Sequence, residues 1–154
     1  MSDLVGQTHG SHGSCSIEQA LGLVGDRWSL LVLRDCFRGL RRFDEIRRDL
    51  GIPRAVLADR LRRLVDAGIL SRRRYSDHPP RDEYRLTQMG RELSPILVAL
   101  MHWGDRWLQV GDPPTVLVHS ACGEPFDLGF HCTHCAVDFG PLEVASRQSE
   151  GILP

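Results

Sequence analysis

Positive charge is concentrated in one short segment of this sequence. The segment RRRYSDHPPRDEYRLT, residues 72–87, places five arginines within sixteen positions. All nineteen basic residues of the chain are arginines, and the planar guanidinium group can grip phosphate oxygens through two parallel hydrogen bonds. Residues 38–91 carry a net charge of +7, whereas residues 1–37 carry −2 and residues 92–154 carry −6. This asymmetry predicts a polyanionic partner for the middle of the chain, and a solvated charged surface is the alternative.

A second set of reactive side chains lies near the C-terminus. It has the spacing H-x2-C-x9-C-x2-C and consists of His119, Cys122, Cys132 and Cys135. Imidazole and thiolate ligands on two short turns suit a tetrahedral structural zinc ion, so the pattern predicts one zinc ion per chain. A lobe of this size with few large apolar side chains would gain stability from such a metal. The alternatives are ligation by His131 or His134, thiols without metal, and a disulfide, which intracellular proteins rarely keep.

The elements that position these side chains begin with two predicted helices. Ser16 is of an N-cap residue type, and apolar residues follow it at helical spacing: Ile17, Leu21 and Val24. Asp26 is the expected cap of a second helix, which Gly39 ends. Cys36 lies in the apolar part of that helix and is predicted to be an unreactive core residue.

Two further helices predict a helix-turn-helix. Residues 44–50 form the first, ending at Gly51, and residues 53–67 form the second, with Pro53 in its first turn. The second helix has one narrow apolar stripe: Leu57, Leu61 and Leu64. Two helices joined by a tight Gly-containing turn, the second with a polar outer face, are typical of DNA-binding domains.

Residues 70–86 predict a basic β-hairpin with the two prolines at its tip, because proline cannot donate a hydrogen bond to a neighbouring strand. A hairpin directly after a helix-turn-helix is a winged helix. The predicted fold class is therefore α+β, a mainly helical winged helix-turn-helix domain with a small C-terminal β lobe. The predicted domains are a disordered tail at 1–14, the DNA-binding and dimerisation domain at 15–110, a linker at 111–114 and a zinc-ribbon-like lobe at 115–154.

A last long helix is predicted from Gln88 to about Val110, and Pro95 is expected to bend it. Its apolar residues form two stripes, the first being Leu93, Leu97, Met101 and Leu108 and the second Ile96, Leu100, Trp103 and Trp107. One small domain normally covers only one such face. The second stripe therefore predicts a symmetric partner chain, and packing between the chain's own two lobes is the alternative.

Five features occur in a recognisable order and spacing: a Cys just before the first helix and the segments LVGDRWSLLVLRD, GLRRFDEI, LADRLRRLVDAGIL and PPRDEYRLTQMGREL. In these features the chain resembles the HxlR-type transcriptional regulators, which belong among the MarR-like winged-helix proteins. The match runs from about Cys15 to Trp107, and EYRLTQMG is its most specific part. The resemblance implies a homodimer, joined through the first and last long helices, on a roughly palindromic DNA operator. The segment after Pro113 is an extension outside the family pattern.

The candidate DNA-binding residues follow from helix and strand geometry. They are Arg41 and Arg42 before the short helix; Arg54, Ala55, Ala58, Asp59 and Arg62 on the outer face of the helix 53–67; and Arg72, Arg73, Arg74 and Arg81 in the hairpin. We expect the helix 53–67 to enter the major groove and the hairpin to contact phosphates. Because strand residues alternate sides, about half of the hairpin arginines should face DNA, and others should pair with acids such as Glu83.

Cys15 matches the family position at which some members sense oxidants or electrophiles. A thiol just ahead of a helix N-terminus is stabilised as thiolate by the helix dipole. The sequence therefore predicts redox sensing at Cys15, and a small residue that packs at the dimer edge is the alternative.

The predicted function is a sequence-specific, homodimeric transcriptional regulator acting as a repressor, switched by Cys15 or by a small ligand whose identity the sequence does not give. The sequence contains no phosphate-cradling glycine loop, no G-x-S-x-G and no H-E-x-x-H, so we predict no enzyme activity. It contains no apolar run long enough to span a membrane and no pattern of a secretion signal, so we predict a cytoplasmic location. The alternative functions are a winged-helix protein-interaction module with a zinc-binding lobe and no operator, and a small-molecule-binding or catalytic lobe on a winged helix that has lost DNA binding.

Overall fold

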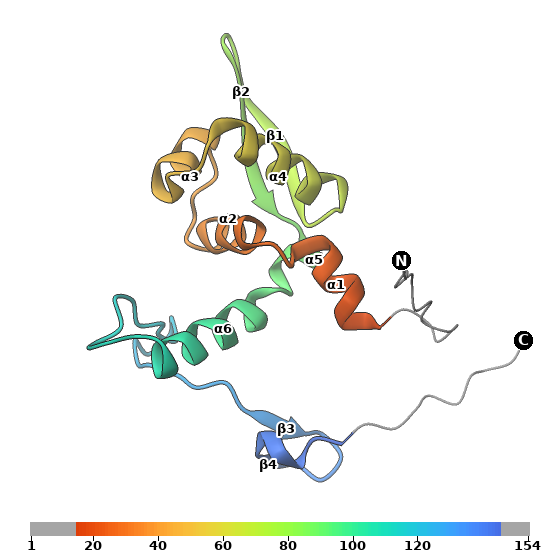
Figure 1. The fold of residues 1–154 in the computed structure, drawn as a ribbon, viewed down its shortest axis with the longest axis vertical. Helices are drawn as coiled ribbons and strands as arrows, with labels where there is room; N and C mark the ends of the chain where they lie inside the picture. The colour runs from red at the N-terminus through yellow and green to blue at the C-terminus, as the bar shows by residue number, and fades with distance from the viewer. Residues whose placement is uncertain (1–14, 146–154) are drawn as a thin grey trace, which may run out of the picture. The chain divides into compact units, whose positions relative to one another are not determined.

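The computed structural model describes residues 15–145 (Figure 1). Its helices are α1 (Ser16–Val24), α2 (Arg27–Phe37), α3 (Phe43–Leu50), α4 (Arg54–Asp66), α5 (Gln88–Arg91), α6 (Ser94–Trp107) and the 3-10 helix η1 (Pro141–Glu143). Its strands are β1 (Leu70–Asp77), β2 (Pro80–Leu86), β3 (Phe130–Cys132) and β4 (Val137–Phe139). The chain divides into two compact units, one up to Leu97 and one from Val98. The predicted tail at 1–14 and the last residues of the predicted lobe, 146–154, lie outside the described residues.

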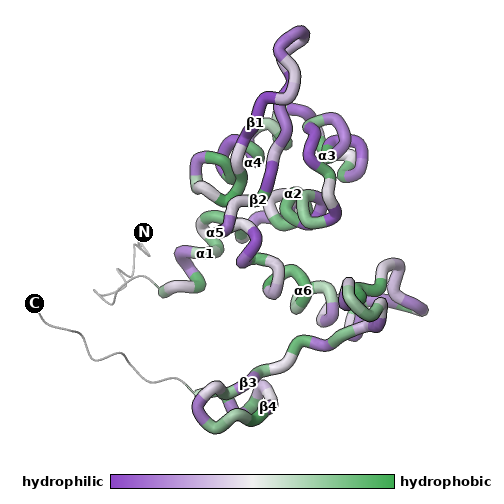
Figure 2. Tube along the Cα trace, turned by 180° about the vertical axis from the view of Figure 1, so that it is seen from behind, coloured by the Kyte–Doolittle hydropathy of each residue, from purple (hydrophilic) through white to green (hydrophobic). Residues whose placement is uncertain are grey.

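The core of the first unit lies between α2, α3, α4 and the start of β1. Its most deeply buried apolar side chains are Val32, Leu33, Ile46, Leu57, Leu61, Leu64, Ile69 and Leu70. The predicted stripe of α4 is confirmed, because Leu57, Leu61 and Leu64 are each at most 1% exposed. In Figure 2 apolar residues colour parts of α2 and α4 green, whereas most of the β1–β2 hairpin is purple or white. The fold prediction of a mainly helical winged helix-turn-helix is confirmed.

Helix caps fix the helix-turn-helix. The Asp26 carboxylate accepts hydrogen bonds from the backbone N–H groups of Trp28 and Ser29 at 3.0 and 3.1 Å, as its predicted capping role requires. Gly51 ends α3 with φ of +59°, a conformation that favours glycine. Pro53 is the N-cap of α4, and the turn between the two helices is three residues long, from Gly51 to Pro53.

The hairpin of residues 70–86, hereafter the wing, pairs antiparallel from Leu70 with Leu86 to Asp77 with Pro80. Its tip contains a cis His78–Pro79 bond, and Pro80 is the first residue of β2. The Tyr84 N–H donates to the Arg41 carbonyl at 2.7 Å, which ties the returning strand to the residues just before α3. The wing is therefore attached to the helix-turn-helix by backbone hydrogen bonds.

Two predicted boundaries were wrong. The helix expected from Gln88 to about Val110 is not one bent helix but two, α5 and α6, separated at Glu92 and Leu93. Proline lacks the N–H that a continuous helix needs and clashes with the carbonyl four residues earlier, which at Pro95 is that of Arg91, so a new helix starts beside it. The N-cap of α1 is Cys15 rather than Ser16.

A buried carboxylate, Asp35, joins α2 to its surroundings. Asp35 is 0% exposed, and its Oδ1 accepts hydrogen bonds from Arg34 at 2.7 Å and Arg38 at 3.4 Å. The same two guanidinium groups donate to Asp49 of α3 at 2.8 and 3.0 Å. Burial raises the pKa of Asp35 above its ordinary value in spite of the arginines, because desolvation disfavours the charged form.

This raised pKa predicts a pH-dependent stability. A carboxyl group with a higher pKa in the folded than in the unfolded state stabilises the fold when protonated, and this contribution falls as the pH rises above about 4. Asparagine cannot titrate. The free energy of unfolding of the wild type minus that of Asp35→Asn is therefore expected to fall as the pH rises from about 3.5 to 7. Urea unfolding followed by circular dichroism measures this, with Asp77→Asn at the exposed wing tip as control. A flat or rising difference would contradict the assignment.

The second unit has little regular structure after α6. It contains the two-stranded β3–β4 hairpin, the isolated bridge between Val118 and Pro125, and η1. None of its described residues, 98–145, is buried. In the described part of the chain, no helix has the length and apolar character needed to cross a membrane.

Candidate nucleic-acid interface

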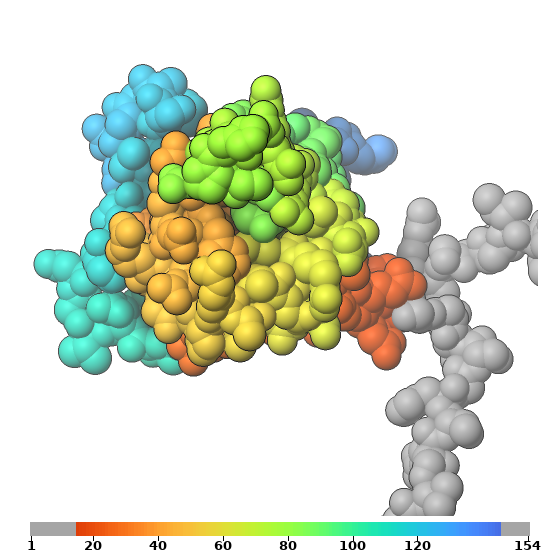
Figure 3. Space-filling model, turned by 90° about the horizontal axis from the view of Figure 1, so that it is seen from above, coloured from red at the N-terminus to blue at the C-terminus, as the bar shows by residue number. Residues whose placement is uncertain are grey.

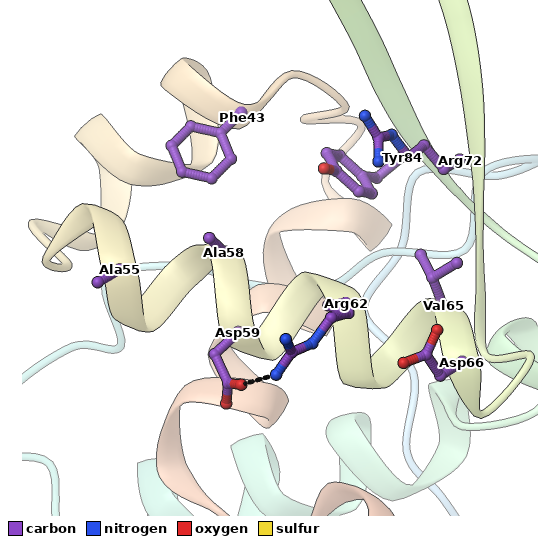
Figure 4. Close-up of a pocket in the computed structure, with 9 residues that line it drawn as sticks. All are labelled: Phe43, Ala55, Ala58, Asp59, Arg62, Val65, Asp66, Arg72 and Tyr84. Atoms are coloured by element: carbon purple, nitrogen blue, oxygen red, sulfur yellow. Dashed lines mark hydrogen bonds and ion pairs between the residues drawn. The ribbon is translucent and has the colours of Figure 1, made fainter.

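The outer face of α4 lies open between α3 and the wing. A hollow of about 590 Å³ is lined by Phe43 of α3, by Tyr84 and Arg72 of the wing, and by the α4 residues Ala55, Ala58, Asp59, Arg62, Val65 and Asp66. Figure 4 shows Ala58 directed toward Phe43, with Arg62 reaching along the helix to Asp59. Ala55, Ala58 and Arg62 are exposed, so the predicted outer face of α4 is where the helical spacing places it. The small alanine side chains permit close approach to this part of the helix.

A second hollow, of about 410 Å³, adjoins the N-terminus of α4. It brings together four arginines from three elements with one aromatic ring of the wing: Arg42, Arg48, Arg54, Arg81 and Tyr75. Asp44, Glu45 and Asp82 also line it, so the charge is mixed but has an excess of cations. The side chains of α3, α4 and the wing form one continuous face in Figure 3. Three of the predicted DNA-binding residues, Arg42, Arg54 and Arg81, thus line the same hollow.

The wing arginines divide into paired and unpaired groups. Asp82 forms ion pairs with Arg72 and, at 3.6 Å, with Arg74. The hydrogen bond from Arg72 holds the pKa of Asp82 below its ordinary range and raises that of Arg72. By contrast, Arg73 and Arg81 have no ion pair within residues 15–145. Both paired arginines remain more than half exposed, so a phosphate must compete with Asp82 for them.

Strand register separates Arg73 from Arg72 and Arg74. Arg72 and Arg74 lie opposite Tyr84 and Asp82, whereas Arg73 lies opposite Glu83. Since strand residues alternate sides, Arg73 lies on the face of the hairpin away from Arg72 and Arg74. The expected ion pair between Glu83 and an arginine of the hairpin exists, and the arginine is Arg85, at 2.7 Å.

Asp59 forms more ion pairs than its position on the outer face of α4 suggests. It forms ion pairs with Arg62, with Arg63 at 3.0 Å and with Arg60 at 3.4 Å. Its carboxylate therefore orients arginines along α4. Arg62 is 68% exposed in its side chain, which leaves it accessible to a nucleic acid.

Aromatic rings support two of the predicted cations. The Arg54 guanidinium lies 5.1 Å from the centre of the Phe43 ring, and that of Arg42 lies 4.8 Å from the Tyr75 ring. Such stacking restricts a guanidinium while leaving its N–H groups able to donate. Arg41 is exposed and forms no ion pair among the described residues. Sequence reasoning did not select Arg48, Tyr75 or Phe43, because only the packing of α3 against α4 and the wing brings them to this face.

The two thiols of the first unit differ sharply. Cys15 is exposed at the N-terminus of α1, and the backbone N–H groups of Glu18 and Ile17 lower its pKa. Cys36 is 8% exposed, and burial raises its pKa to about 12. Cys36 thus has the buried, unreactive environment that its position in α2 predicted, whereas Cys15 combines access with thiolate stabilisation.

The four predicted zinc ligands occupy two turns of the second unit. The Cys122 Sγ lies 3.4 Å from the His119 Nδ1. The backbone N–H of Cys135, its thiol and the N–H of His134 lower the pKa of Cys132. Within residues 15–145, no three His, Cys, Asp or Glu side chains are gathered as a metal-binding group. The structure therefore forms the two halves of the predicted ligand set without joining them.

Comparison with known proteins agrees with this geometry. The family model of the HxlR-like helix-turn-helix matches residues 23–112. The chain is 47% identical over 137 residues to the uncharacterized HTH-type transcriptional regulator Rv3095 of Mycobacterium tuberculosis, covering 88% of this chain and 87% of that protein. The solved structure of PA1607 is similar with a TM-score of 0.79 at 33% identity, over 89% of this chain and 96% of that one. The redox regulator HypR in its oxidized form is similar with a TM-score of 0.58 at 35% identity, over 62% of this chain and all of that one.

The family model matches more than half of the chain. The matched residues include the helix-turn-helix, its wing and the cationic face that they share. The chain belongs to the HxlR-like helix-turn-helix family of DNA-binding transcriptional regulators.

Proposed function

We propose that this protein is a homodimeric repressor that binds a roughly palindromic operator. In this proposal α4 enters the major groove, Arg54 and Arg62 contact bases or phosphates, and the wing lies along the backbone. The observation that carries it is the convergence of α3, α4 and the wing on one face that holds Arg42, Arg48, Arg54 and Arg81. Cations gathered from three separate elements on one surface favour a polyanion partner over a solvated face.

Exposed apolar side chains on α1 and α6 support the dimer. Ile17 and Leu21 of α1 are 69% and 59% exposed. The second stripe of α6 is exposed as well, with Ile96, Leu100, Trp103 and Trp107 each 48% or more. Leu93 and Leu97 of the first stripe instead pack against the core. Large apolar side chains left in water at helical spacing favour association with a second copy.

The experiment is a mobility shift with the DNA upstream of the protein's own coding sequence, followed by footprinting and by light scattering of the free protein. We expect a dimer that protects two half-sites about one helical turn apart and loses affinity steeply as salt rises. A monomeric protein, or binding that ignores salt and sequence, would refute the proposal. Stable capture of another protein without any footprint would instead favour the interaction-module alternative.

We further propose that Cys15 switches the operator complex, a role supported by its exposure, its lowered pKa and the likeness to the redox regulator HypR. Diamide, which takes up two electrons and two protons as two thiols form a disulfide, should release wild-type protein from the operator. Cys15→Ser should bind with unchanged affinity and resist diamide, while Cys36→Ser should respond as the wild type does. Release of the Cys15→Ser variant by diamide would eliminate Cys15 as the switch.

A further inference from the structure

The second unit contains two turns of matching construction, separated by 13 positions. We name residues 119–123 the first turn and residues 132–136 the second turn. Each closes an antiparallel β pair, and the pairs correspond: Val118 with Pro125 before the first turn, and His131 with Asp138 before the second. Adding 13 to the first pair gives the second in both strands, so the register of the two hairpins is identical.

The hydrogen bonds inside the turns correspond as well. The Gly123 N–H donates to the His119 carbonyl at 2.8 Å, and the Ala136 N–H donates to the Cys132 carbonyl at 2.8 Å. His119 and Cys122 of the first turn therefore occupy the same positions as Cys132 and Cys135 of the second. The sequence alone does not show this correspondence, because the first ligand is a histidine in the first turn and a cysteine in the second.

The last residue of each turn has a positive φ. Gly123 has φ of +76°, which glycine adopts readily. Ala136 has φ of +55°, and it is the one residue other than glycine with positive φ among residues 15–145. A Cβ disfavours this conformation, which persists where surrounding structure enforces it. A need to keep the preceding residues of the second turn in one conformation would account for the positive φ of Ala136.

We propose that the two turns bind one structural Zn²⁺ between them, through His119 and Cys122 of the first and Cys132 and Cys135 of the second. Each turn directs two ligands from positions three residues apart, the arrangement that a pair of zinc-binding turns uses. Residues 126–129 connect the hairpins without helix or strand. Few hydrogen bonds therefore oppose the approach of the two turns.

The second unit is loosely packed, and a bound metal would stabilise it. None of residues 98–145 is buried, and several large apolar side chains near the turns are exposed, including Val118, Phe130 and Val137. The chief aromatic contact between the strands is the stack of Phe130 on Phe139, with ring centres 5.5 Å apart. A unit with so little buried surface needs a covalent or metal cross-link to hold one conformation.

The rival ligands fit less well. His131 lies one residue before the second turn, at the position that Val118 has before the first, and therefore has no counterpart ligand. His134 lies within the second turn, at the position of Ala121 in the first, and has no counterpart ligand there. The equivalence of the two turns therefore selects one histidine and three cysteines.

The test is the zinc content of full-length protein purified under reducing conditions without chelator, measured by atomic emission. We expect about one zinc per chain in the wild type, and the same in the controls Cys15→Ser, His131→Gln and His134→Gln. Cys122→Ser and Cys135→Ser should each lose most of the metal. Replacement by Co²⁺ should give the intense visible absorption of a tetrahedral thiolate site in the wild type and not in Cys122→Ser.

Less than about half a zinc per chain in the wild type would overturn the proposal, as would full retention in Cys122→Ser. Loss of zinc in His134→Gln would overturn the choice of His119. Because the arginine face lies in the first unit, the metal-free variants should still bind operator DNA. The zinc proposal and the proposed repressor function can therefore fail independently.

Discussion

Replacing Arg54 and Arg81 together with alanine is expected to weaken operator binding by more than about 1,000-fold near 0.1 M salt. Both guanidinium groups line the hollow of about 410 Å³ at the N-terminus of α4, and neither forms an ion pair among the described residues. No carboxylate therefore needs to be displaced before they bind phosphate. A dimer loses four such cations in the double variant, which should reduce the slope of log K against log salt by about 3.6. Fluorescence anisotropy of a labelled operator at four or more salt concentrations measures both quantities.

Arg73→Ala is the matched control for this experiment. Arg73 is also an exposed arginine of the wing without an ion pair among residues 15–145, but unlike Arg81 it does not line the hollow at the N-terminus of α4. The control removes the same charge per chain as Arg81→Ala, so a general effect of net charge would appear in both variants. We expect Arg73→Ala to change affinity less than Arg81→Ala. An equal loss in both single variants, or an unchanged slope in the double variant, would contradict the assigned face.

Local patterns predicted the scaffold of this site because each depends on few residues. The stripe of Leu57, Leu61 and Leu64 defines the buried face of α4, and the opposite face follows by angle. The prolines at 79 and 80 mark the wing tip because proline cannot donate a hydrogen bond to a neighbouring strand. Helix ends were less predictable: the continuous periodicity across Pro95 concealed the break between α5 and α6.

The pairing of the arginines could not be predicted, because it depends on contacts between elements. Asp82 engages Arg72 and Arg74 through the register of the wing. Arg48 and Tyr75 join the candidate site through the fit of the wing against α3. The number of arginines predicts that this surface is positively charged. The positions of the carboxylates decide which arginines can bind an anion without first breaking an ion pair.

The strand-to-helix junction EYRLTQMG contains the residue for which we expect the largest loss of stability. Gly90 is buried in α5, and a Cβ built on it would lie 2.2 Å from the carbonyl oxygen of Ile69 and 3.1 Å from a methyl carbon of Leu86. That same carbonyl accepts hydrogen bonds from both the N–H and the hydroxyl of Thr87, each at 3.1 Å. Backbone and not a flexible side chain blocks the added methyl group. Gly90 therefore permits the wing, α5 and the end of α4 to meet.

Gly90→Ala is accordingly expected to destabilise the protein by about 3 kcal/mol, since overpacking against backbone forces the junction apart and weakens the hydrogen bonds of Thr87. For a chain of this size the loss corresponds to a fall in Tm of about 10 °C. Thermal and urea unfolding followed by circular dichroism measure it, and operator affinity measured well below Tm should also fall because the wing is displaced. The control is Gly104→Ala in α6, where a Cβ would meet nothing within 4 Å. There the higher helix propensity of alanine should leave stability unchanged or raise it by up to about 1 kcal/mol. Equal effects of the two substitutions would show that the close approach at Ile69 is not what requires glycine in this junction.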